Sequence, residues 1–79
     1  MNLEGKSREV LQGILIEKLK DKTLSQKGLA KYIKDILDKK GFSAGNITNL
    51  KTKENASLAD LRELLSYFDD YKVYELSKK

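Results

Sequence analysis

The sequence predicts an all-α fold, and three observations support this prediction. Apolar residues recur at spacings of three and four along most of the chain, which is the pattern of helices that bury one face. The chain contains no proline, so no residue forces a helix to break. A serine precedes each expected helix, where its hydroxyl can accept a hydrogen bond from an unpaired N–H of the first turn. These serines are Ser7, Ser25, Ser43 and Ser57.

The first two helices are expected at about residues 8–21 and from Gln26 to about Lys39. In the first, Ile16 lies off the buried face and Gly13 would let a neighbouring helix approach closely. The second is expected to end at Gly41, since glycine readily adopts the left-handed turn conformation that follows many helix ends. The buried face of the first helix consists of Val10, Leu11, Ile14, Leu15 and Leu19. That of the second consists of Leu29, Ala30, Ile33, Ile36 and Leu37.

The third helix is expected at about residues 44–52, held by Ile47 and Leu50, and the fourth runs from Leu58 to about Phe68. The tail, residues 71–76, is rich in β-forming residues. We predict a short C-terminal β-strand there, with an extension of the fourth helix as the alternative. A strand would pair with the N-terminal segment or with a second copy of itself. The chain then forms one domain over residues 1–79, with its core at about 8–68 and a tail at 69–79.

The composition argues against an enzyme. The chain has no cysteine and no histidine, which removes the thiolate nucleophile, the commonest general base and the commonest metal ligands. No pair of carboxylates stands out, and neither a P-loop nor a dinucleotide-binding glycine pattern is present. The longest apolar run is too short to span a bilayer, and the N-terminus does not read as a signal peptide. We expect no catalytic residues, no metal, no cofactor and no membrane contact, and a cytoplasmic location.

Charge is distributed unevenly along the chain. Residues 1–53 contain twelve Lys/Arg and six Asp/Glu, whereas residues 54–79 contain four and six. A basic body with a mildly acidic end attracts a polyanion to one side.

The stretch 41–53, GFSAGNITNLKTK, carries the functional prediction. Outside its two apolar anchors it has small, amide, hydroxyl and cationic side chains, and no acid. A short helix of this kind suits a groove of duplex DNA. The alternative is a solvated surface helix without a partner.

Three segments together resemble a known family. They are LSQKGLAKYI at 24–33, GFSAGNITNL at 41–50 and ASLADL at 56–61. They contain five motifs in a fixed order. These are a helix start with a hydroxyl residue followed by Gln, a Leu-Ala pair, a Gly-x-Ser turn, an isoleucine four residues after that serine, and a later Ser-Leu-x-x-Leu. This resembles the helix-turn-helix of the lambda-repressor/Cro-like (Xre-type) family, over about residues 10–68.

The resemblance implies a four-helix helix-turn-helix domain that binds double-stranded DNA as a homodimer through its C-terminal segment. The implied role is sequence-specific transcriptional regulation, as a repressor in a bacterium or its phage, with helix 44–52 in the major groove. Gln26 would bind a phosphate and brace the next helix. Base edges and nearby phosphates would be contacted by Ser43, Ala44, Gly45, Asn46, Thr48 and Asn49. The DNA backbone would be contacted by Lys51, Thr52 and Lys53.

Two departures from the family pattern bear on these expectations. Residues 34–40 are a seven-residue insertion between the second and third helices, which we expect to add two turns to the second helix. Ala44 and Gly45 are small where the family often has long polar side chains. The departures leave an alternative function open, in which a helix-turn-helix protein inhibits another regulator by protein binding, as an antirepressor does. Four aromatic residues near the C-terminus are expected to form core or dimer contacts: Tyr67, Phe68, Tyr71 and Tyr74.

Overall fold

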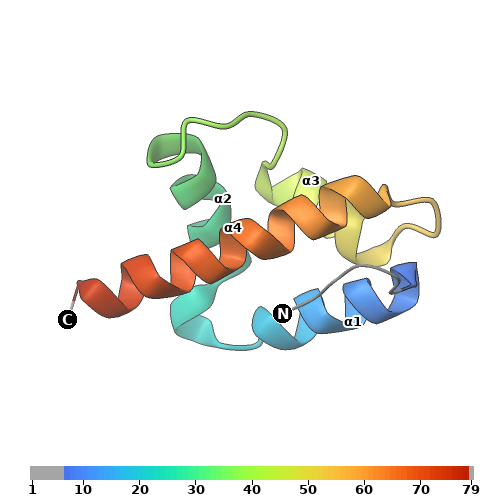
Figure 1. Ribbon diagram of the computed structural model, residues 1–79, viewed down its shortest axis with the longest axis horizontal. Helices are drawn as coiled ribbons and strands as arrows, with labels where there is room; N and C mark the ends of the chain where they lie inside the picture. The colour runs from blue at the N-terminus through green and yellow to red at the C-terminus, as the bar shows by residue number, and fades with distance from the viewer. Residues whose placement is uncertain (1–6, 79) are drawn as a thin grey trace.

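The computed structural model describes residues 7–78, and every regular element among them is helical (Figure 1). This confirms the all-α class. The longest helix, α4, crosses the whole molecule, α1 and α2 pack against it, and α3 packs against α1 and α2 (Figure 1). In chain order the elements are α1 (Arg8–Lys18), the 3-10 turn η1 (Lys22–Leu24), α2 (Gln26–Asp35), α3 (Ala44–Thr52) and α4 (Leu58–Ser77).

The helix starts follow the sequence prediction. Each of the four serines accepts a hydrogen bond from the backbone N–H three residues further along, so every α-helix has its expected N-cap. A cap of this kind stabilises a helix by about 1 kcal/mol. Local side-chain chemistry therefore fixes where each helix begins.

One core cluster joins all the helices. Leu11 and Leu15 of α1 are fully buried, while Val10 is 47% exposed, contrary to expectation. Ile14 and Leu19 are partly buried and pack against this core, so the predicted face of α1 is present except at Val10. Gly13 also differs from expectation, since no atom lies within 4 Å of where its Cβ would be. The core consists of Leu11, Leu15, Leu24, Leu29, Tyr32, Ile33, Phe42, Ile47, Leu50, Ala56, Leu61, Leu64, Leu65, Phe68 and Tyr71.

The insertion does not lengthen α2, so that prediction was wrong. The helix ends at Asp35, and residues 36–43 form a loop. Asp38 has φ +55°, a left-handed conformation that a helix cannot continue through. Phe42 at the far end is buried and meets Tyr67 edge-on at 5.6 Å between ring centroids. Returning Phe42 to the core competes with two further helical turns, which explains the loop.

Gly41 adopts φ +94°, which confirms it as a left-handed turn residue. It lies in the loop just before α3 rather than at the end of α2.

The predicted C-terminal β-strand is also incorrect. Residues 71–76 belong to α4, which continues to Ser77, so the alternative of a longer fourth helix holds. Tyr71 and Tyr74 pack against Tyr32 of α2, with ring centroids 5.4 and 5.0 Å apart. Phe68, Tyr71 and Tyr74 are three residues apart, so only a helix places all three rings on one side. Packing on α2 thus overrides the local β preference.

No helix among residues 7–78 combines the length and the apolar composition that a bilayer crossing requires.

Candidate functional site

The outward face of α3 is the candidate site. Ile47 and Leu50 are buried and attach the helix to the core, as predicted. The remaining predicted site residues on α3 and its flanks lie on the opposite side. Lys51 is half-buried, and the other eight are exposed: Ser43, Ala44, Gly45, Asn46, Thr48, Asn49, Thr52 and Lys53. Seven of the ten predicted site residues therefore lie on α3, and Ser43 and Lys53 are its N-cap and C-cap.

The tenth, Gln26, braces the start of α3. Its side-chain amide nitrogen donates to the carbonyl oxygen of Ala44 and to the hydroxyl of Thr48, at 2.6 Å each. The Thr48 hydroxyl in turn donates to the Ala44 carbonyl at 3.1 Å. The bracing role predicted for Gln26 is present. Because the Thr48 hydroxyl is already engaged in this network, it is a weaker candidate for contacting a ligand.

A second glutamine, which was not predicted from the sequence, braces the other end of α3. Gln12 of α1 donates to the carbonyl oxygens of Leu50 and Lys53, at 2.9 Å each. One turn earlier, Arg8 donates to the Ala56 carbonyl at 2.8 Å and to the Glu54 carbonyl. Residues 8 and 12 are four apart, so the sequence already placed both on one side of α1. The sequence does not show that the end of α3 lies against that side of α1.

Other polar side chains of α3 bond to nearby backbone. Asn46 donates through its side-chain nitrogen to the Gly41 carbonyl at 2.9 Å, which holds the loop against the start of the helix. Thr52 donates to the Thr48 carbonyl at 2.9 Å. Within residues 7–78, in contrast, Asn49 forms no side-chain hydrogen bond. Its amide is the exposed donor and acceptor of α3 best placed to meet a ligand.

The part of the molecule formed by α2, α3 and the loop between them is rich in unpaired positive charge. α3 carries no acidic residue. In the described part of the chain, ion pairs form between Lys18 and Asp69, between Lys20 and Glu17, and between Lys78 and Glu75. None of these pairs involves α2, α3 or the loop between them. In these segments and at the C-cap of α3, the lysines without a carboxylate partner are Lys27, Lys31, Lys34, Lys39, Lys40, Lys51 and Lys53.

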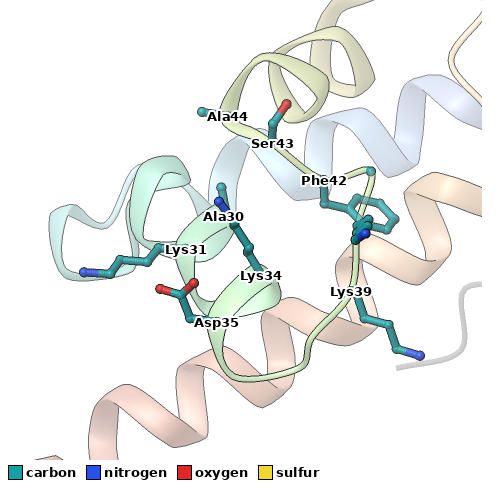
Figure 2. A pocket seen from close by; sticks show the side chains of 10 residues that line it. Ala30, Lys31, Lys34, Asp35, Lys39, Phe42, Ser43 and Ala44 are labelled. Atoms are coloured by element: carbon teal, nitrogen blue, oxygen red, sulfur yellow. The ribbon is translucent and has the colours of Figure 1, made fainter.

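A hollow of about 570 Å³ lies beside the start of α3, between α2 and the 36–43 loop (Figure 2). Ala30 of α2 and Phe42 of the loop contribute apolar surface to its walls, and Ser43 and Ala44 close the end nearest α3. The sequence does not predict this hollow, because the hollow exists only where residues 36–43 form a loop.

Within residues 7–78, no three Asp or Glu side chains come together in a group that could hold a metal ion. No protein-family model, curated protein or solved structure matches the chain.

Proposed function

We propose that the protein is a helix-turn-helix regulator that binds double-stranded DNA, with α3 as the recognition helix in the major groove. The observation that supports this most directly is the outward face of α3. It is exposed, it carries no acid, and glutamines from two other helices hold the helix at both ends. The major groove of B-DNA is about 12 Å wide and admits an α-helix. A braced helix enters it without a large ordering cost.

The side chains of α3 have separate roles in this proposal. Asn49 reads bases, because its amide can bond the N6 and N7 atoms of adenine at once. The Ala44 methyl contacts a thymine methyl, and small Gly45 lets the helix backbone approach the DNA. Lys51 and Lys53 bind phosphates, which supply affinity without sequence information. Both N–H groups of the Gln26 side-chain amide are donated to α3, so Gln26 supports DNA binding by bracing the helix and not by binding a phosphate.

The protein belongs to a bacterium or its phage, acts as a homodimer in the bacterial cytoplasm and represses transcription by excluding RNA polymerase. Two copies place two α3 helices on half-sites about one DNA turn apart, which compensates for the few base-reading side chains of each. The end of α4 supports this assembly. Val73 and Leu76 are 68% and 59% exposed there, and α4 projects beyond the other helices (Figure 1).

The test is a set of binding titrations with duplex DNA, followed by fluorescence anisotropy. A preferred duplex is first selected from a random pool and then compared with a scrambled duplex of the same composition. Asn49→Ala should weaken binding to the preferred duplex by about 1–3 kcal/mol and change the scrambled one little. Asn55→Ala removes the same chemical group from an exposed loop position outside α3 and serves as the matched control. Equal losses on both duplexes would show that Asn49 does not read bases.

A second function, protein binding, is favoured by one observation. Ile36, at the start of the loop, is 52% exposed and adjoins Tyr74 and Lys78 at the edge of a second, smaller pocket. Such a surface suits an inhibitor that contacts another regulator, as an antirepressor does. If micromolar wild-type protein shows no complex with any duplex at low salt, DNA binding is excluded and this function replaces it.

A further inference from the structure

The 36–43 loop is anchored at both ends, although it has no regular structure. Beside α2, the N–H of Lys39 donates to the Ile33 carbonyl at 3.0 Å. At the other end Phe42 is buried, and the Gly41 carbonyl accepts the bond from Asn46 of α3. The loop therefore holds Lys39 and Lys40 in a defined region of the surface.

That region is strongly basic. We call the four lysines around the hollow, Lys31, Lys34, Lys39 and Lys40, the basic flank. Asp35 is the only acid that lines the hollow, and it forms no ion pair among the described residues. Four cations around one carboxylate leave an excess of positive charge with no intramolecular partner. An anionic surface is the partner that such an excess favours.

The basic flank is continuous with α3. The same hollow that the lysines surround is closed by Ser43 and Ala44, the first residues of the recognition helix and its cap. Figure 2 shows Lys31 and Lys39 extending outward from the hollow in different directions. Side chains that spread in this way suit a long charged surface beside α3 better than a single small anion inside the hollow.

We propose that the basic flank binds the sugar-phosphate backbone of DNA next to the bases that α3 faces. This inference rests on the proposed function, and it gives the insertion a role in that function. A helix in the major groove lies between two phosphate backbones, so a basic element at its start meets one of them. The loop extends the protein along that backbone, adding affinity but no base discrimination.

The experiment compares two double variants that remove the same charge. Lys39→Gln/Lys40→Gln changes the loop, whereas Lys20→Gln/Lys72→Gln changes exposed lysines after α1 and on α4, outside the hollow and α3. Binding to the preferred duplex is measured over a range of salt concentrations, and circular dichroism checks that both variants fold. Each phosphate contact contributes about 0.9 to the slope of log affinity against log salt. The loop variant should therefore lose about 1.8 from the magnitude of that slope, and the control far less.

The outcomes separate the two proposals. If the wild type does not bind DNA, both are wrong. If the wild type binds but the loop variant keeps its slope, or both variants lose the same amount, only the basic flank is wrong. The ratio of affinities for preferred and scrambled duplexes should be the same in the loop variant as in the wild type. A fall in this ratio would show that the loop reads bases, which contradicts backbone binding.

Discussion

Replacing Gly28 with alanine should push a methyl group against Tyr71. A Cβ on Gly28 would lie 2.3 Å from the Tyr71 hydroxyl oxygen and 3.2 Å from the Ser25 hydroxyl oxygen. Tyr71 is only 2% exposed, and its ring packs against Tyr32 and Phe68. The hydroxyl cannot move away unless the packed ring moves with it. At Gly28, α2 therefore has no room for a side chain beside Tyr71 of α4.

The size of the effect follows from a comparison with Gly13. Inserting extra atoms into a packed core costs about 1–3 kcal/mol. Gly13→Ala meets no atom within 4 Å and gains about 1 kcal/mol from the higher helix propensity of alanine. Gly28 lies in the first turn of α2, so Gly28→Ala gains at most the same helix-propensity term of about 1 kcal/mol. The free energies of unfolding of the two variants should therefore differ by at least about 1–3 kcal/mol, or about 4–8 °C in Tm per kcal/mol.

Urea denaturation followed by circular dichroism measures both free energies. A third variant, Gly28→Ala/Tyr71→Phe, removes the oxygen that the new methyl meets. In the Tyr71→Phe background, Gly28→Ala should cost at least about 1 kcal/mol less than it does in the wild type. The reasoning fails if Gly28→Ala is as stable as Gly13→Ala, or if Tyr71→Phe does not reduce its cost. Either result would mean that α2 and α4 do not meet at this pair.

Three further predictions concern α3 and the tyrosines. Gln26→Ala should lower the free energy of unfolding by about 1 kcal/mol and also weaken DNA binding, since it removes the brace on α3; unchanged stability in urea would show that the brace contributes nothing. Ser43→Ala should cost about 1 kcal/mol through the lost cap, whereas Ser43→Gly should cost only a few tenths, as measured in the same way. Burial raises the pKa of Tyr71, and the hydrogen bond to the carboxylate of Glu63 raises the pKa of Tyr67. The folded state then holds these protons more tightly than the unfolded chain, so stability is intact below pH 10 and falls as the pH rises above it. Urea midpoints on either side of pH 10 test this, and Tyr67→Phe should make the fall smaller.

Much of the fold could be predicted because its determinants are local. A serine before an apolar 3,4 pattern defines a helix start from a few neighbouring residues, and all four starts were located correctly. Ile47 and Leu50 identified the buried side of α3 in the same way, and thereby its exposed side. Gly41 could be assigned a left-handed turn from its residue type alone.

The errors occurred where distant residues decide between two local possibilities. Ile36 continues the apolar stripe of α2, yet the helix stops because Phe42 returns to the core against Tyr67. The β-forming tail is helical because its tyrosines pack on Tyr32, some forty residues earlier in the chain.

For this protein, the sequence by itself determined the all-α class, the four helix starts and an exposed third helix without acidic residues. Only the tertiary structure decided that the insertion is a loop, that the tail is helix, and that Gln12 and Gln26 hold α3 at both ends. The physical reason is the range of the interactions. Caps and helical periodicity act within one or two turns, whereas the burial of an aromatic ring or a brace between helices depends on which distant segments meet.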